Sequence, residues 1–280
     1  MYQERELPMF RAKKLELDEH KPYIMVNRCY QAFEGEGLTI GQAKWFFRTQ
    51  GCSVGCVWCD SRPTWRFDLE LAKWPQENHA MFELHEKDFE AFVEELIKRA
   101  PTLRHISLTG GEPLQQNPEL LPKFVDILHR YNFLIQLETS GQICGDSELQ
   151  LIKSIANHGG LISVDLKTPS AKLKCNIDAL DRMLYTLATM DLPCSVQVKA
   201  VNMIGDTIDY EFIKEHYNRW LSLGYDNIEY IITPCWAPGK DANISAEWLE
   251  GLMQDNSWVR KPKVILQQHK VIYGTHHEDS

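Results

Sequence analysis

Three cysteines, Cys52, Cys56 and Cys59, form a CxxxCxxC run in a glycine-containing stretch that we expect to be a loop. Thiolates at this spacing in an intracellular chain favour metal binding. Iron–sulfur cubanes usually have four cysteine ligands, and structural zinc usually has four protein ligands. Three cysteines would leave one iron of a [4Fe–4S] cluster with an open position for chemistry. The alternatives are a zinc knuckle completed by a distant histidine and three cysteines that pack in the core.

Further polar groups follow predicted strands. Thr109-Gly110-Gly111-Glu112-Pro113 follows one strand, Glu138-Thr139-Ser140-Gly141 follows the next, and Lys167 follows a third. Paired glycines let the backbone approach a ligand closely. Each feature also has an ordinary interpretation, namely a strand-to-helix turn, a helix N-cap and a solvated lysine. Their shared position at strand ends favours a function.

Apolar runs and helical periodicity alternate along the chain, which predicts βα units and a parallel sheet. We expect an α/β fold, a partial TIM-like barrel of about six parallel strands after an initial pair, with chemistry at the carboxyl ends of the strands. The expected organisation is a polar N-terminal extension (1–22) and a single domain (23–280) that contains an insertion (61–87). Strands are predicted at 23–30, 43–49, 105–108, 133–137, 161–166, 195–201, 228–232 and 264–268, and helices near 89–97, 120–128, 148–157, 177–190, 210–223 and 246–253.

Composition excludes several classes of function. The 280 residues have a net charge of −9, which disfavours a nucleic-acid-coating role or binding to an anionic membrane. The sequence has no apolar run of 18 residues and no secretory signal. Eight cysteines in a chain of this length are too few for a disulfide scaffold. We therefore expect a protein of the reducing cytoplasm.

The cysteine run, with an aromatic Trp58 before its last cysteine, and the Gly-Gly-Glu turn together resemble the radical S-adenosylmethionine (SAM) enzymes. The resemblance implies that Cys52, Cys56 and Cys59 hold three irons of a [4Fe–4S] cluster and that SAM chelates the fourth. One electron would then split the sulfonium and release a 5′-deoxyadenosyl radical. The positions that the resemblance places on the SAM side are Gly110, Gly111, Glu112, Glu138 and Lys167.

A narrower resemblance covers residues from about 24 to 274. Phe33-Glu34-Gly35-Glu36-Gly37, Phe47-Arg48, Cys59-Asp60-Ser61 and Gln267-Gln268-His269-Lys270 occur in the order typical of the 7-carboxy-7-deazaguanine synthase family. The resemblance implies a lyase that converts 6-carboxy-5,6,7,8-tetrahydropterin to 7-carboxy-7-deazaguanine with loss of ammonia, in queuosine biosynthesis. In this chemistry the radical comes from SAM, and no protein side chain acts as acid or base.

The same resemblance implies roles around the substrate. Glu36 would accept hydrogen bonds from the donor edge of the pterin. Arg48 would pair with the substrate carboxylate through its planar guanidinium. His269 would close the pocket, and Thr109 would contact the substrate. Ser61 stands where the family usually has a threonine whose hydroxyl binds Mg²⁺, an ion that prefers oxygen ligands. The ordinary alternatives are a solvated Glu36, a salt-bridged Arg48, a turn-capping Ser61 and a His269 at the edge of the core.

Glu34 is a departure, because the family typically has glutamine before Gly-Glu-Gly. A carboxylate can still accept hydrogen bonds from a pterin amine and ring N–H, but it cannot donate one. The resemblance also implies a flavodoxin or ferredoxin as the electron donor and a homodimer. Two other functions remain open: a radical SAM activase that forms a glycyl radical on a partner enzyme, and a zinc- or cluster-bearing interaction protein.

Overall fold

The computed structural model describes residues 21–75, 81–191, 193–203, 205–235 and 245–273. Within them, one ten-stranded sheet has the strand order β10-β9-β8-β7-β6-β5-β2-β1-β4-β3. The expected extension (1–22) lies outside the described residues except for its last two positions. The strands are β1 (Ile24–Phe33), β2 (Ala43–Thr49), β3 (Ala72–Lys73), β4 (Phe82–Leu84), β5 (His105–Gly110), β6 (Leu134–Thr139), β7 (Leu161–Leu166), β8 (Ser195–Asn202), β9 (Ile228–Pro234) and β10 (Lys263–Val264).

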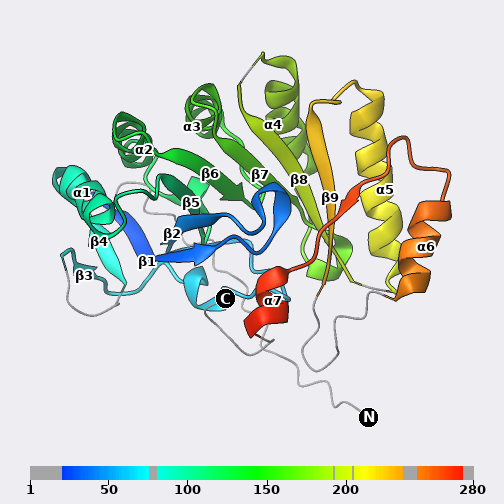
Figure 1. The fold of residues 1–280 in the computed structure, drawn as a ribbon, viewed down its shortest axis with the longest axis horizontal. Coiled ribbons are helices and arrows are strands. Elements are labelled where there is room, and N and C mark those ends of the chain that lie inside the picture. Colours follow the sequence, from blue (N-terminus) through cyan, green and yellow to red (C-terminus); the bar gives the residue numbers. More distant parts are fainter. Residues whose placement is uncertain (1–20, 76–80, 192, 204, 236–244, 274–280) are drawn as a thin grey trace, which may run out of the picture.

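From β2 through β5 to β10 the strands are parallel and lie in chain order. β1 pairs with β2 in the antiparallel sense, and β4 pairs with β1 in the same sense. The sheet curves without closing (Figure 1). The predicted α/β fold, with six parallel strands after the first pair, is confirmed. The segment predicted as an insertion (61–87) adds β3 and β4 to the antiparallel edge of this sheet.

Helices cover the outer face of the curved sheet, since each crossover between neighbouring parallel strands has the same hand. Figure 1 shows α1 to α5 in an arc on this face, and the β1–β2 connection and α7 on the open side. α2 buries the apolar stripe that its sequence periodicity predicts, from Leu120 to Leu128. The helices are α1 (Phe89–Arg99), α2 (Leu120–Arg130), α3 (Asp146–Asn157), α4 (Ile177–Thr189), α5 (Thr207–Ser222), α6 (Ala246–Gln254) and α7 (Gln268–Tyr273).

The open face of the sheet carries buried polar side chains. Ser107, Gln136, Ser163 and Gln197 come from four neighbouring strands and are each at most 6% exposed. They alternate along their strands with apolar residues that pack beneath the helices, as strand geometry requires. The Gln197 side-chain oxygen accepts a hydrogen bond from the Leu38 N–H at 2.8 Å, so the β1–β2 turn covers this face. The interior of the partial barrel is therefore polar and prepared for a polar ligand.

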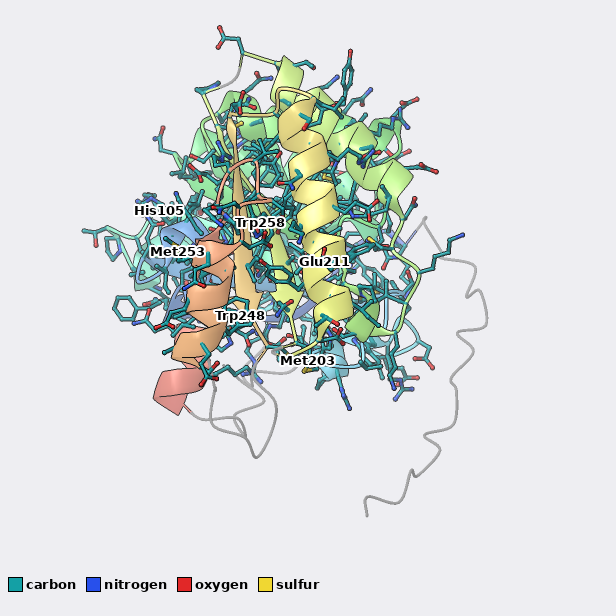
Figure 2. The ribbon with its side chains drawn as sticks, turned by 90° about the vertical axis from the view of Figure 1, so that its right-hand side faces the viewer. His105, Met203, Glu211, Trp248, Met253 and Trp258 are labelled. Carbon is teal, nitrogen blue, oxygen red and sulfur yellow. The ribbon has the colours of Figure 1, made fainter. Side chains whose placement is uncertain are left out.

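The last predicted strand (264–268) is wrong in extent. Only Lys263 and Val264 pair with β9, after which the chain leaves the sheet and begins α7 at Gln268. The Gln268 N–H donates to the Gly35 carbonyl at 2.9 Å, and this contact with the β1–β2 turn replaces the strand ladder. The chain before β10 is held to α5 by Trp258, whose indole N–H donates to the Tyr210 hydroxyl at 2.8 Å (Figure 2). None of the helices in the described part of the chain is long and apolar enough to span a membrane.

Candidate active site

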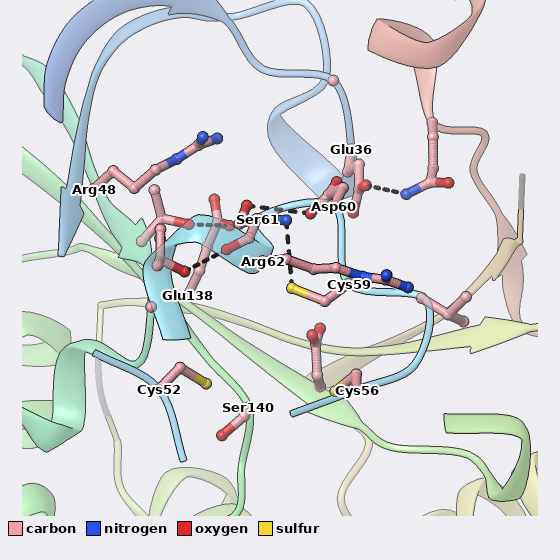
Figure 3. A pocket seen from close by; sticks show the side chains of 18 of the residues that line it. Glu36, Arg48, Cys52, Cys56, Cys59, Asp60, Ser61, Arg62, Glu138 and Ser140 are labelled. Atoms are coloured by element: carbon pink, nitrogen blue, oxygen red, sulfur yellow. Dashed lines mark hydrogen bonds between the residues drawn. The ribbon is translucent and has the colours of Figure 1, made fainter. Parts of the chain in front are cut away.

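A cavity of about 840 Å³ opens at the carboxyl ends of the parallel strands (Figure 3). Its size is sufficient for a cofactor together with a small substrate. Among the residues predicted from sequence, Glu112 alone does not line it. The others do, namely Glu34, Glu36, Arg48, Cys52, Cys56, Cys59, Ser61, Thr109, Gly110, Gly111, Glu138, Lys167 and His269.

The cysteine loop is held to its surroundings by backbone and indole contacts. The Gly51 N–H donates to the Thr64 carbonyl at 2.7 Å, and the Val57 N–H donates to the Ala171 carbonyl at 3.3 Å. The Trp58 indole N–H donates to the Ser170 hydroxyl at 3.3 Å. The loop is thus tied both to the segment that follows it and to the segment after β7.

The donor set of this loop fits an iron–sulfur cubane better than a single metal ion. In the described part of the chain no three His, Cys, Asp or Glu side chains are grouped to hold one ion. Structural zinc needs four ligands around one centre, whereas thiolates on a cubane bind separate irons and stand further apart. Burial raises the pKa of Cys52 to about 12, and burial likewise raises the pKa of Cys56 and of Cys59. Metal binding must therefore displace thiol protons.

The Gly-Gly-Glu turn presses against the base of the cysteine loop. The Glu112 N–H donates to the Gly51 carbonyl at 2.8 Å, and a Cβ on Gly111 would lie 2.2 Å from that carbonyl oxygen. The Glu112 carboxylate does not line the cavity, and it accepts hydrogen bonds from the Thr139 hydroxyl (2.8 Å) and the Ser140 N–H (2.7 Å). Glu112 therefore joins the end of β5 to the end of β6.

Gly111→Ala is expected to displace the cysteine loop, because the new Cβ meets a backbone oxygen that cannot move aside. We expect a loss of about 1–3 kcal/mol of stability, as for other overpacked sites, together with less iron after reconstitution. Thermal unfolding and iron content measure the two effects. Gly251→Ala in α6 is the matched control, because its Cβ meets nothing within 4 Å and alanine favours helix. Normal unfolding and iron content in Gly111→Ala would contradict this prediction.

Arg48 lies beside the start of the Gly-Gly-Glu turn, because β2 pairs with β5 at Arg48 and Thr109. One terminal nitrogen donates to the Tyr30 hydroxyl at 3.1 Å, and the guanidinium lies 5.6 Å from the centre of the Tyr30 ring. Its Nε is buried without a hydrogen-bond partner, and no ion pair is made by Arg48 among the residues that the structure describes. A half-buried guanidinium whose Nε is buried and unpaired is suited to bind an anionic ligand.

Glu138 and Thr109 lie between the cysteine loop and the β1–β2 turn. The Glu138 carboxylate accepts hydrogen bonds from the Ser107 hydroxyl (2.7 Å), the Thr109 hydroxyl (2.9 Å) and the Gln136 amide (2.8 Å). These contacts fix its orientation at the end of β6, while the residue still lines the cavity.

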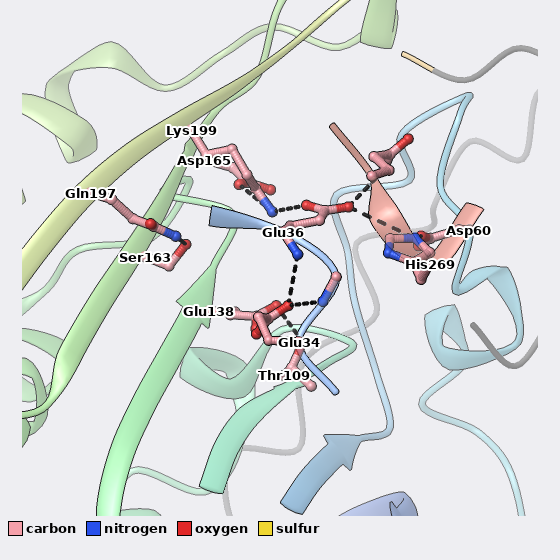
Figure 4. A network of polar contacts seen from close by, with 12 residues as sticks. Glu34, Glu36, Asp60, Thr109, Glu138, Ser163, Asp165, Gln197, Lys199 and His269 are labelled. Atoms are coloured by element: carbon pink, nitrogen blue, oxygen red, sulfur yellow. Dashed lines mark hydrogen bonds and ion pairs between the residues drawn. The ribbon is translucent and has the colours of Figure 1, made fainter. Parts of the chain in front are cut away.

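A chain of alternating charges crosses the cavity wall (Figure 4). The Lys167 ammonium lies 2.6 Å from Asp165, and the Lys199 ammonium lies 3.7 Å from the other Asp165 oxygen and bonds directly to Glu36. Burial raises the pKa of Glu36, but Lys199, His269 and a hydrogen bond from Gln267 outweigh it and hold the pKa at about 2. Asp165 and Lys199 were not singled out from sequence; their position near the ends of β7 and β8 was the available signal.

His269 closes the side of the cavity next to the β1–β2 turn. Gly35 allows this approach, since a Cβ there would lie 2.2 Å from the His269 Nδ1. The Nε2 lies 3.9 Å from a Glu36 oxygen and 3.9 Å from an Asp60 oxygen, and it has no hydrogen-bond partner among the described residues. Burial lowers the pKa of His269 despite both carboxylates. The ring is therefore neutral near pH 7 and has an unused nitrogen for a ligand.

Ser61 follows the cysteine loop, and its hydroxyl donates to an Asp60 oxygen at 3.2 Å. The other Asp60 oxygen lies 3.6 Å from the Lys270 ammonium. Both residues line the cavity. A hydroxyl and a carboxylate are oxygen donors of the kind that Mg²⁺ accepts, with waters or substrate oxygens as the remaining ligands.

The partial barrel and its three-cysteine loop define the class of protein. The model of the radical SAM superfamily matches residues 46–232, so the chain is a radical SAM protein, for which a [4Fe–4S] cluster and SAM are implied. It is 30% identical over 204 residues to the 7-carboxy-7-deazaguanine synthase of Bacillus subtilis, covering 70% of this chain and 74% of the relative. It is also 30% identical to the Escherichia coli K12 enzyme of that name, covering 65% of this chain and 86% of the relative.

A crystal structure of QueE from Escherichia coli matches with a TM-score of 0.59 and 25% sequence identity, covering 92% of this chain and 100% of that chain. Within the radical SAM superfamily, the chain belongs to the 7-carboxy-7-deazaguanine synthase family. The expected family is therefore confirmed.

Proposed function

We propose that this chain is a lyase that converts 6-carboxy-5,6,7,8-tetrahydropterin to 7-carboxy-7-deazaguanine with loss of ammonia. The observation that carries the proposal is the pairing, in one cavity, of a three-cysteine loop with Arg48, a half-buried guanidinium that has no carboxylate partner among the described residues and whose Nε is buried without a hydrogen-bond partner. A small acid is the ligand that satisfies this cation. The activity of the relatives in the same family supports the same substrate.

Cys52, Cys56 and Cys59 would hold the cluster. When bound, the cluster and SAM supply a 5′-deoxyadenosyl radical, so the protein needs no acid or base of its own. Gly110 and Gly111 would bring the end of β5 close to SAM. The other residues proposed on this side are Glu138 and Lys167. Glu112 would act indirectly, by holding the end of β6 in place, because its carboxylate accepts hydrogen bonds from Thr139 and Ser140.

The substrate would lie between Arg48 and the β1–β2 turn. Arg48 would bind its carboxylate, and Glu36, which stays ionised because its pKa is held at about 2, would accept hydrogen bonds from the donor edge of the pterin. Thr109 would contact the ring, and His269 would close the pocket with its unused Nε2. The enzyme's contribution is orientation and charge pairing around a reactive intermediate.

Several further assignments are part of this proposal. Ser61 would provide a hydroxyl ligand to Mg²⁺, which would also hold substrate oxygens. A flavodoxin or ferredoxin would supply the electron, in the cytoplasm. We further propose that residues 23–280 form a single radical SAM domain and that the enzyme is a homodimer.

The test is an anaerobic reaction of the reconstituted protein with SAM, dithionite, Mg²⁺ and 6-carboxytetrahydropterin, followed by mass spectrometry. We expect 7-carboxy-7-deazaguanine from the wild type and none from Cys56→Ala. If 5′-deoxyadenosine accumulates without the deazapurine, the pterin substrate is wrong. If the cluster binds SAM and neither product forms, the lyase proposal falls, and a glycyl-radical activase with a protein partner becomes the hypothesis to examine.

A further inference from the structure

Lys44 is a fully buried lysine beneath the β1–β2 turn. The Lys44 side chain is 2% exposed, and its ammonium lies 3.1 Å from a carboxylate oxygen of Glu34. The Glu34 side chain is 7% exposed. The ammonium also donates to the Thr39 hydroxyl at 2.9 Å and to the Gln136 side-chain oxygen at 2.6 Å. A buried lysine is retained only when its charge is paired and its donors are used, and here both conditions are met.

The Glu34 carboxylate receives four hydrogen bonds, all from the protein. One oxygen accepts from the N–H groups of Gly35 (2.9 Å) and Glu36 (3.2 Å). The other accepts from Lys44 and from the Gln136 amide at 3.0 Å. Two carboxylate oxygens offer about four acceptor sites, so this set uses all of them. Figure 4 shows Glu34 turned back toward the backbone of its own turn, next to Glu138.

Glutamine, the residue expected here in this family, does not fit the same surroundings. One oxygen would become an NH₂ group, which would face either two backbone N–H donors or the Lys44 ammonium and the Gln136 amide. A donor that faces buried donors leaves polar groups unsatisfied. The carboxylate of Glu34 therefore needs the ammonium of Lys44 as its buried counter-ion, and the ammonium needs the carboxylate in the same way.

We propose that Glu34 and Lys44 are a coupled pair of positioning residues, which hold the β1–β2 turn so that the Glu36 carboxylate faces the substrate. Glu34 then does not read the pterin itself, and its difference from the family's glutamine leaves the substrate class unchanged. The part of this inference that concerns the substrate rests on the proposed function. Burial and the Glu138 charge raise the pKa of Glu34, the Lys44 ammonium lowers it, and the resulting pKa is about 7.

The experiment compares the wild type with Glu34→Gln, Lys44→Met and the double variant. At about pH 8, where a carboxylate of pKa about 7 is mostly ionised, each single variant should raise KM for 6-carboxytetrahydropterin about 10-fold or more. In the double variant the cation and the anion are removed together, so no unpaired buried charge remains, and KM should return to within about 3-fold of the wild type. SAM cleavage without pterin should stay unchanged in all three. The matched control is Glu36→Gln with Lys44→Met, which should show no recovery.

The same four proteins are unfolded by heat without substrate. Both single variants should lower the midpoint, and the double variant should regain most of the loss. The pairing would be overturned if the rise in KM of the double variant equalled the product of the two single rises. It would also be overturned if the fall in its unfolding midpoint equalled the sum of the two single falls. If the double variant regained stability but its KM did not recover, the two residues would be a stabilising pair, and their role in positioning Glu36 would be overturned. If the wild type does not turn over the pterin, the proposed function fails, while the unfolding cycle still decides whether Glu34 and Lys44 form a coupled pair.

Discussion

Cys56→Ala is expected to lose iron after anaerobic reconstitution and to cleave SAM at least about 100-fold more slowly than the wild type. The expected loss exceeds the 10–100-fold typical of residues that stand behind metal ligands, because a thiolate that binds iron directly would be removed. Cys56 is buried and lines the cavity, and alanine in its place leaves two cysteines of the run. Iron content, the visible chromophore and 5′-deoxyadenosine release measure the effect.

The matched control is Cys235→Ala. Cys235 follows β9 and lines the same cavity, but it lies outside the CxxxCxxC run. We expect this variant to keep its iron and its SAM cleavage. Equal losses in both variants would mean that the three cysteines of the run do not hold the cluster alone, and that Cys235 takes part in binding it.

The strands could be predicted well because each holds apolar residues at alternate positions in a short segment that turn residues or a helical pattern bound on both sides. The predicted bounds of β2 (Ala43–Thr49) and β7 (Leu161–Leu166) agree with the structure. α5 begins three residues before the predicted start at 210. Its first turn is polar and is fixed by Asp206, whose carboxylate accepts hydrogen bonds from the next turn. Apolar periodicity does not report such a turn.

The cavity-lining set could largely be predicted because its motifs follow strands, and the carboxyl ends of parallel strands meet at one edge. The contacts between these motifs could not be predicted. The Lys199–Glu36 pair joins residues 163 positions apart, and the Glu34–Lys44 pair depends on how the β1–β2 turn folds over the sheet. Glu112 illustrates the same limit, since its position in the motif does not say whether its carboxylate faces a ligand or Ser140.

Lys199→Met is expected to make substrate turnover depend on pH in the acidic range. In the wild type the pKa of Glu36 is held at about 2, chiefly by Lys199 acting against burial, so Glu36 is ionised at every working pH. Without Lys199 the burial remains, and the pKa of Glu36 rises. kcat/KM should then fall as the pH is lowered through the new pKa, by about 10-fold for each pH unit below it, while the wild-type profile stays flat.

The stability of the pair has a defined pH window. Because the pKa of Glu36 is depressed, its contribution is present above the ordinary glutamate pKa of about 4.3 and is lost as the pH falls toward about 2. Because the pKa of Lys199 is raised, its contribution is present below the ordinary lysine pKa of about 10.4 and is lost as the pH rises through the folded value. Lys199→Met should therefore unfold at lower temperature than the wild type across the whole range between them.

Two variants separate charge pairing from a general loss of packing. Lys199→Arg keeps the cation beside Glu36 and should keep the flat acidic profile, even if the longer side chain lowers kcat/KM uniformly. Lys98→Met, at a lysine whose side chain is 81% exposed, should change neither profile nor stability. A uniform loss of activity in Lys199→Met, with no acidic limb, would show that the ionisation of Glu36 does not depend on Lys199. The hydrogen bond from Gln267 would then have to be enough to keep Glu36 charged.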